Sequence, residues 1–209
     1  MKNTLFSIFF LSLFSLNGYA QSCLPEGITF ATQGSIDSFT INYPGCTMIE
    51  GDVTITAYPN PSFITNLDGL SGLTAIGGTL LISDQPNMTG LSGLGNLTTI
   101  GKDLQLEYLP ALMDLNDLEN ITTVGGYLYI KEINQLKNLD GLVNLTQVRG
   151  VVMWYNNSLT SISALQNLTT LEDLSLFVNP ALTSLTGLEN LTSLSGSLWL
   201  ANNQSLTSV

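Results

Sequence analysis

A repeat of 23 or 24 residues runs through most of the chain and limits the folds open to it. Five successive units occupy 71–94, 95–118, 119–142, 143–165 and 166–188, a sixth covers 189–209, and 49–70 is an irregular unit before them. Each complete unit carries seven apolar columns, which in the third unit are Ile121, Val124, Leu128, Ile130, Leu136, Leu139 and Leu142. One unit cannot bury these residues, so the units are expected to stack and share a continuous core.

Each unit is predicted to contain one strand. Leu128 and Ile130 alternate with polar or aromatic residues, which indicates a strand with one buried face. The other columns recur every three or four residues, too irregularly for a long helix. Gly125-Gly126 predicts a sharp corner before the strand. Because stacked strands lie about 4.8 Å apart and place like residues over like, we predict an all-β fold, a right-handed parallel β-solenoid with few or no helices.

Residues 1–20 have the pattern of a secretory signal peptide. Lys2 gives the positive start, an apolar run follows, and small residues precede the expected cleavage after Ala20. The run is shorter than the roughly 20 residues that span a bilayer. A lipoprotein attached through Cys23 is an alternative, although the preceding residues depart from a lipid-attachment sequence. We therefore expect an exported protein, secreted or displayed at the cell surface or outer envelope.

After the signal peptide we expect an N-terminal cap at 21–48 and repeats at 49–209. Val209 falls inside a unit, so we expect the natural protein to continue with further coils. The only cysteines are Cys23 and Cys46. In an exported chain such a pair is expected to form a disulfide, and two free thiols are the alternative.

Composition excludes several functions. The net charge of −11 argues against nucleic acid and against anionic membrane surfaces as partners. The absence of histidine excludes Ser-His-Asp and Cys-His catalysis and His-ligated zinc. No acidic run matches a calcium loop, so neither a metal nor a cofactor is expected.

The segment "GCTMIEGDVTI" at 45–55 resembles the first coil of the receptor L domain, a family found in the ectodomains of insulin and epidermal growth factor receptors. In that family a cysteine at this place pairs with an upstream cysteine in an N-terminal cap. The resemblance implies a Cys23–Cys46 disulfide and a cap with a strand near 28–30 and a helical turn near 35–39. The repeats also resemble L-domain-like bacterial surface proteins, and 171–179 has leucine-rich-repeat spacing. The resemblance implies extracellular recognition, and no residue-level ligand motif transfers with it.

Aromatic residues gather at the outward strand positions of the later units. Lys131, Trp154 and Phe177 are predicted to be neighbours in three successive coils. A contiguous exposed aromatic patch suggests a surface that binds sugar rings or a protein partner. The alternative is that aromatic residues only cover the strands. The candidate ligand-binding residues are Tyr127, Tyr129, Lys131, Trp154, Phe177 and Trp199.

Two polar columns are predicted to be structural. Five asparagines, each in an Asn-Leu/Ile-Thr sequon, are expected to bond neighbouring coils as a ladder; they are Asn96, Asn120, Asn144, Asn167 and Asn190. A threonine column beside them is expected to stack its hydroxyl groups, with ice binding as the alternative; it holds Thr74, Thr98, Thr122, Thr146, Thr169 and Thr192.

These observations favour a non-catalytic binding or adhesion module that recognises an extracellular protein or glycan. A structural envelope or matrix component without a discrete ligand is the alternative. A polysaccharide-cleaving enzyme is a remote alternative, because it needs two nearby carboxylates. Asp103 and Glu107 share a strand face but are predicted to lie about 13 Å apart.

Overall fold

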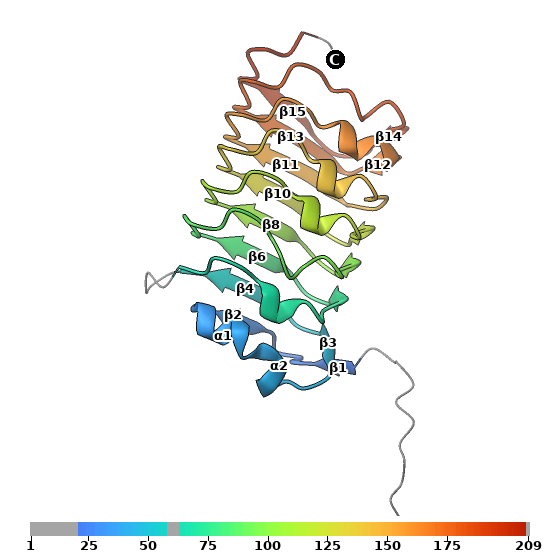
Figure 1. The fold of residues 1–209 in the computed structure, drawn as a ribbon. Helices are drawn as coiled ribbons and strands as arrows, with labels where there is room; N and C mark the ends of the chain where they lie inside the picture. The colour runs from blue at the N-terminus through green and yellow to red at the C-terminus, as the bar shows by residue number, and fades with distance from the viewer. Residues whose placement is uncertain (1–20, 58–62, 208–209) are drawn as a thin grey trace, which may run out of the picture.

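The computed structural model describes residues 21–57 and 63–207, so the predicted signal peptide lies outside the described residues. The chain winds into coils stacked along one axis, with the described N-terminal and C-terminal coils at opposite ends (Figure 1). The main sheet has eight parallel strands in the order β15-β13-β11-β10-β8-β6-β4-β2. Their bounds are β2 Ile28–Phe30, β4 Val53–Thr56, β6 Leu80–Ser83, β8 Leu104–Glu107, β10 Tyr127–Lys131, β11 Gly150–Trp154, β13 Asp173–Phe177 and β15 Leu198–Ala201.

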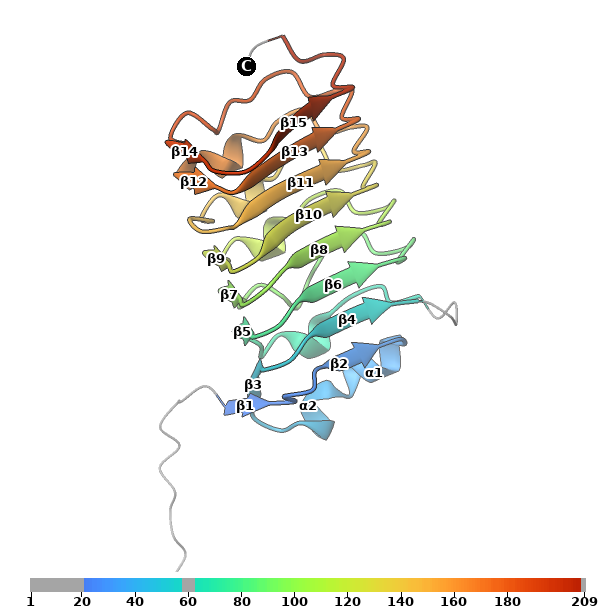
Figure 2. The ribbon, with the colours of Figure 1, turned by 180° about the vertical axis from the view of Figure 1, so that it is seen from behind.

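The strands stack in the register that the repeat predicts. Leu128 pairs with Leu104 in the coil before it and with Val151 in the coil after it. Like columns therefore lie over one another, and Figure 2 shows the strands of the main sheet one above the next. The predicted parallel β architecture is confirmed, while its right-handed sense stays a prediction.

Two smaller parallel sheets occupy a second side of the coils. One has the order β1-β3-β5-β7-β9, with bounds Gln21–Cys23, Cys46–Ile49, Ala75–Ile76, Thr99–Ile100 and Thr123–Val124. The other pairs β12, Thr170–Leu171, with β14, Ser193–Leu194. Between these two sheets, Gln147 forms an isolated bridge with Thr123 of β9 but belongs to no strand. This interruption falls where the 143–165 unit has one residue fewer before its strand.

Short 3₁₀ helices complete several coils on the remaining side. They are η1 Asp68–Leu70, η2 Asn116–Leu118, η3 Asp140–Leu142 and η4 Ser163–Asn167. The last leucine of each of the first three is fully buried. All seven apolar columns of the third unit are fully buried as well, from Ile121 to Leu142. Burying one such aliphatic side chain contributes about 1.5–3 kcal/mol, which makes the stacked columns the main source of stability.

The glycine corner forms for a different reason from the one predicted. Neither Gly125 nor Gly126 has a positive φ. A Cβ on Gly125 would lie 2.2 Å from the carbonyl oxygen of Gly101 in the coil below. Close approach of neighbouring coils, rather than left-handed backbone, therefore requires glycine here.

Left-handed backbone appears instead directly after each of six strands of the main sheet. The residues there are not glycines, yet they have φ between 54° and 60°; they are Asp84, Tyr108, Glu132, Tyr155, Val178 and Asn202. The backbone N–H of Tyr108 still donates to Lys131 O at 3.0 Å in the next coil. These residues thus turn the chain without breaking the stack, at a cost of about 1–2 kcal/mol for each non-glycine residue.

The N-terminal segment closes one end of the core. The predicted disulfide between Cys23 and Cys46 is present, with a Cα–Cα distance of 5.8 Å. Strand β2 coincides with the strand expected at 28–30, whereas the helical turn begins earlier than expected, as α1 Gln33–Asp37, and continues as α2 Phe39–Asn42. Phe39 packs edge-on against Phe30, with ring centroids 5.8 Å apart. Strands β1 and β2 each add an outermost strand to a sheet, so this segment covers the first coil.

None of the helices in the described part of the chain has the length and apolar character that a bilayer crossing needs.

Candidate functional site

The outward face of the main sheet carries the candidate aromatic residues. Lys131 of β10 pairs with Trp154 of β11, and Trp154 pairs with Phe177 of β13. The sequence predicts this order, because the three residues share one repeat column. Trp199 of β15 lies in the neighbouring column, beside Ser175.

Four rings on this face form a continuous group, called here the aromatic cluster: Trp154, Tyr155, Phe177 and Trp199. The centroid of Trp199 lies 6.1 Å from that of Trp154 and 5.2 Å from that of Phe177. Tyr155 meets Phe177 edge-to-face at 5.3 Å. Each aromatic pair in such a geometry contributes about 0.5–1.5 kcal/mol beyond the burial of apolar area. The rings are therefore set relative to one another before any ligand arrives.

The sheet supports the aromatic cluster from below and leaves its outer side open. Trp154 Nε1 donates to Ser175 Oγ at 2.8 Å, which fixes the indole ring. Val152, on β11 between Tyr129 and Ser175 of the neighbouring strands, is 7% exposed. Trp199 and Tyr155 remain 49% and 43% exposed. Rigid rings with free faces can bind a partner at little conformational cost.

Tyr127, at the other side of the face, is held by the fold itself. Its hydroxyl donates to Asp173 Oδ2 at 2.5 Å, two coils away. The ring lies over Gly150, where a Cβ would come within 2.4 Å of Tyr127 Cε1, and it stacks on Tyr129 with centroids 5.7 Å apart. The hydrogen bond to Asp173 is the main reason that the pKa of Tyr127 rises to about 12. Tyr127 thus acts as a strut across three coils.

Lys131 lies between Tyr129 and the Trp154 ring of the aromatic cluster. Its ammonium lies 2.8 Å from Glu107 Oε1. The same nitrogen lies 4.6 Å from the ring centroid of Tyr129 and 5.4 Å from that of Trp154. A charge held by a carboxylate and two rings in this way is already satisfied within the protein.

Arg149 is satisfied in a similar way. Its Nη2 donates to Glu172 Oε1 at 3.0 Å, and its guanidinium lies 5.5 Å from the centroid of the Tyr127 ring. The hydrogen bond to Glu172 raises the pKa of the Arg149 guanidinium, and the hydrogen bond from Arg149 lowers the pKa of Glu172. Of the six predicted binding residues, Trp154, Phe177 and Trp199 belong to the open cluster. Tyr127 and Lys131 are engaged internally, and Tyr129 contacts both of them.

Several carboxylates on this face serve the backbone. Asp103 Oδ1 accepts a hydrogen bond from Tyr127 N at 2.8 Å, one coil later. Asp52 and Asp173 do the same for Thr79 N and Ser197 N. These bonds contribute to lowering the pKa of Asp52, mainly through Thr79, and that of Asp173, where the Tyr127 hydroxyl contributes most. Within the described residues, no three or more His, Cys, Asp or Glu side chains gather as a metal site would require.

The family model for the receptor L domain matches residues 45–121 and 98–209. The two matches overlap, and in the structure the main sheet runs unbroken through the shared stretch. This chain belongs to the receptor L domain family. Receptor L domains are ligand-binding modules of receptors and are not enzymes. No curated protein matches the chain.

One member of the aromatic cluster of this L domain was not predicted from the sequence. Tyr155 follows β11 in the left-handed position, so it does not obey the period-two alternation that marks outward strand residues. Its column was nonetheless visible in the repeat, since Tyr108 occupies the same place two units earlier.

Two asparagine ladders tie the coils of the L domain together. In the outer ladder, the five sequon asparagines each donate from Nδ2 to a carbonyl of the coil before; Asn120 reaches Gly95 O at 2.7 Å. The inner ladder was not predicted and is buried. There Asn179 Nδ2 donates to Met153 O at 3.0 Å, and Asn179 Oδ1 accepts from Asn156 N at 3.2 Å. The asparagine that ends the leucine-rich-repeat spacing at 171–179 was the available signal.

The threonine column is held within the stack. Thr98 Oγ1 donates to Thr74 O at 3.0 Å, and Thr192 Oγ1 donates to Thr169 O at 3.0 Å. Five of the six hydroxyl groups thus donate to a carbonyl of the coil before, which favours the structural interpretation of the column.

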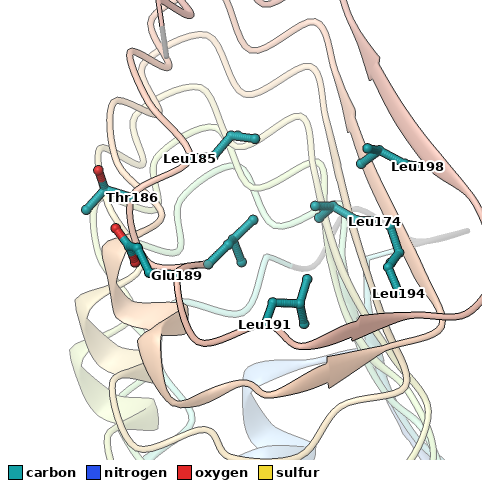
Figure 3. Close-up of a pocket in the computed structure, with 8 residues that line it drawn as sticks. Leu174, Leu185, Thr186, Glu189, Leu191, Leu194 and Leu198 are labelled. Atoms are coloured by element: carbon teal, nitrogen blue, oxygen red, sulfur yellow. The ribbon is translucent and has the colours of Figure 1, made fainter. Parts of the chain in front are cut away.

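A hollow of about 440 Å³ lies within the last described coils (Figure 3). Leu174 of β13 and Leu198 of β15 line it together with Leu185, Leu188, Leu191 and Leu194. These leucines belong to the columns that fill the core of the preceding coils. Thr186 and Glu189 also line the hollow, and Leu198 is 56% exposed, so the hollow is an open part of the core with a mainly leucine lining.

Proposed function

We propose that this L domain is a non-catalytic module that binds an extracellular protein or glycan through the aromatic cluster. The observation that carries the proposal is the contact of four rings, two of which keep more than two fifths of their surface open. Aromatic anchors near the centre of an interface supply most of its binding energy. Family membership supports a binding role, and the disulfide supports action in an oxidising compartment.

Charge supports the same choice of partner. The chain has a net charge of −11, and three of its few cations are paired with carboxylates. A nucleic acid would need free cations to replace its counterions. A protein or a glycan makes no such demand, and both can pack against exposed rings.

The alternative role as an envelope or matrix component has support of its own. Tyr127, Lys131 and Arg149 are all satisfied by partners within the fold. On that alternative, the aromatic cluster would only shield the sheet.

The test is binding to glycan arrays and to extracellular extracts by the parent and by a Trp154→Ala, Trp199→Ala variant. We expect the double variant to lose at least about tenfold in affinity, because each residue is an interface anchor. Ile41→Ala with Met113→Ala is the matched control, since both are exposed apolar residues away from the cluster. If the Trp variant binds every ligand of the parent as well as the control does, the aromatic cluster is not the binding surface.

A further inference from the structure

A second hollow lies at the edge of the main sheet, and no residue of the aromatic cluster lines it. It has a volume of about 430 Å³. Ligand pockets commonly have volumes of roughly 300–1,000 Å³. Its lining combines carboxylates, rings and prolines; the residues are Phe63, Asp84, Pro86, Tyr108, Pro110, Glu132 and Asn134.

The backbone presents three of these side chains as one column. Asp84, Tyr108 and Glu132 directly follow β6, β8 and β10. The backbone of each has a positive φ, in the left-handed region. Their N–H groups donate to the next coil, Asp84 to Glu107 O, Tyr108 to Lys131 O and Glu132 to Trp154 O. At the β spacing, the backbones of Asp84 and Glu132 are about 10 Å apart with Tyr108 between them. The column is therefore rigid and places an aromatic ring between two carboxylates.

The far wall of the groove is also fixed. Gln85, next to Asp84, is fully buried, and its Oε1 accepts a hydrogen bond from Ile64 N at 2.8 Å. This bond holds the chain that carries Phe63 against the groove. Phe63 and Tyr108 are 42% and 47% exposed, so both rings face solvent.

Neither carboxylate has a cationic partner within residues 21–57 and 63–207. Across the described part of the chain, the ion pairs join Lys102 to Asp52, Lys131 to Glu107 and Arg149 to Glu172. Asp84 and Glu132 are in none of them. The proximity of the Glu132 carboxylate is the main cause that raises the pKa of Tyr108. The groove thus has unbalanced negative charge beside apolar walls.

We propose that this groove binds an arginine side chain on an extended segment of a protein partner. A guanidinium can form two parallel hydrogen bonds with one carboxylate while its planar face lies on the Tyr108 ring. The aliphatic part of the side chain would contact Phe63 and the prolines. A neutral or acidic segment would form neither the charge-assisted hydrogen bonds with a carboxylate nor the cationic contact with the Tyr108 ring. The groove shares no lining residue with the aromatic cluster, although Tyr155 follows Glu132 one coil later in the same left-handed column. Binding there would extend recognition beyond the proposed function.

The test uses two peptides and calorimetry. One is an acetylated, amidated Gly-Arg-Gly-Arg-Gly peptide, and the other replaces each arginine by neutral citrulline of the same shape. The parent is expected to bind the arginine peptide at least about tenfold more tightly than the citrulline peptide, because charge-assisted hydrogen bonds are about twice as strong as neutral ones. Added salt is expected to narrow the difference. Equal affinity for the two peptides would overturn the proposal.

Variants locate the site. Asp84→Asn with Glu132→Gln is expected to abolish the preference for arginine, and asparagine suits the left-handed backbone at 84. Glu26→Gln with Glu119→Gln removes the same charge from exposed positions elsewhere and is expected to keep the preference. Tyr108→Leu, which keeps apolar volume, is expected to weaken binding of the arginine peptide by several-fold. If the Glu26→Gln, Glu119→Gln variant loses the preference for arginine as fully as the Asp84→Asn, Glu132→Gln variant does, only the net charge of the protein matters. The groove proposal would then be wrong.

The Trp154→Ala, Trp199→Ala variant separates this proposal from the proposed function. It is expected to bind the arginine peptide as the parent does, whether or not it has lost the partner of the aromatic cluster. If it loses the arginine peptide, the groove is not an independent site.

Discussion

The hydroxyl of Tyr127 donates a hydrogen bond to Asp173 across the whole width of an intervening coil, and the ring passes directly over Gly150. One side chain thereby joins β10, β11 and β13. The outward face of the main sheet is thus braced on one side by polar contacts and left open on the other by the aromatic cluster.

Replacing Gly150 by alanine is expected to disturb this brace. The added Cβ would lie 2.4 Å from Tyr127 Cε1, so the ring must move away from Asp173. We expect a loss of about 1–3 kcal/mol in the free energy of unfolding, as for other overpacked sites. In a Tyr127→Ala background the same substitution should cost much less. Gly72→Ala is the control, because a Cβ added there would have no atom within 4 Å of it; equal costs at both glycines would contradict the brace.

The brace also predicts a pH dependence. The pKa of Tyr127 is raised from its ordinary 10.0 to about 12, so the folded state favours the neutral phenol. This stabilisation is complete below pH 10.0 and is lost as the pH rises through about 12. The pKa of Asp173 is lowered by the same hydrogen bond, so its contribution is present above its ordinary value of 3.8 and is lost as the pH falls further.

Melting temperatures of the parent and of Tyr127→Phe, measured across pH, check this dependence. The parent is expected to be the more stable protein at neutral pH, and its advantage should shrink at both extremes. A constant difference from acid to alkaline pH would show that the Tyr127–Asp173 bond does not contribute.

A third prediction concerns Asp103 and Gly126. Asp103 Oδ1 accepts from Tyr127 N, and a Cβ on Gly126 would lie 2.1 Å from that oxygen. The same pairing recurs at Asp52 with Gly78 and at Asp173 with Gly196. In three coils another residue replaces the aspartate, and the next coil then has no glycine at the corner. The pairs, each one coil apart, are Thr79 with Lys102, Tyr127 with Arg149, and Gly150 with Glu172.

Gly126→Ala is therefore expected to cost about 1–3 kcal/mol in the parent. In an Asp103→Thr background, which copies the arrangement of Thr79 and Lys102, the added cost should be clearly smaller. Denaturant unfolding of the four proteins gives the coupling energy, expected to be at least about 0.5 kcal/mol for such contacting residues. Additive costs would refute the pairing.

A repeat reveals its buried columns and the order of its coils directly. Leu128 and Ile130 were correctly placed in the core, because alternation along a strand decides which face is buried. The order of Lys131, Trp154 and Phe177 also followed from the repeat, since each lies one coil after the last. Gly126 was explained wrongly, because its role depends on a side chain in another coil rather than on its own backbone.

Other parts of the site depended on geometry that periodicity does not encode. Tyr155 joins the aromatic cluster only because left-handed backbone turns it beside Phe177. Tyr127 looked free to bind a ligand, and its bond to Asp173 depends on the missing side chain at Gly150. The groove at Tyr108 combines residues that directly follow the strands of the main sheet, such as Asp84 and Glu132, with residues two positions later, such as Pro86 and Asn134.

The two asparagine ladders predict different costs for the same substitution. Asn179→Ala would leave Met153 O and Asn156 N buried without these partners. We expect it to lower the free energy of unfolding by about 2–4 kcal/mol, since each unsatisfied buried group costs roughly 1–3 kcal/mol. Asn144→Ala, in the exposed outer ladder, should cost about 1 kcal/mol or less, because water can replace its bond to Glu119 O. Equal losses in denaturant unfolding would mean that burial does not distinguish the ladders.

Val178 is a β-branched residue held at φ 55°, and it should be possible to relieve this strain. Val178→Asn is expected to raise the free energy of unfolding by about 1 kcal/mol, because asparagine tolerates left-handed backbone far better than valine. Asn202 already occupies the same place in the next coil at φ 58°. The bond from residue 178 N to Ala201 O would be kept, since it involves only the backbone. Val143→Asn is the matched control, because Val143 is also partly buried but has right-handed backbone at φ −59°. If both substitutions lower the melting temperature equally, the left-handed turn after β13 imposes no strain on valine, and the cost assigned to this column of residues is wrong.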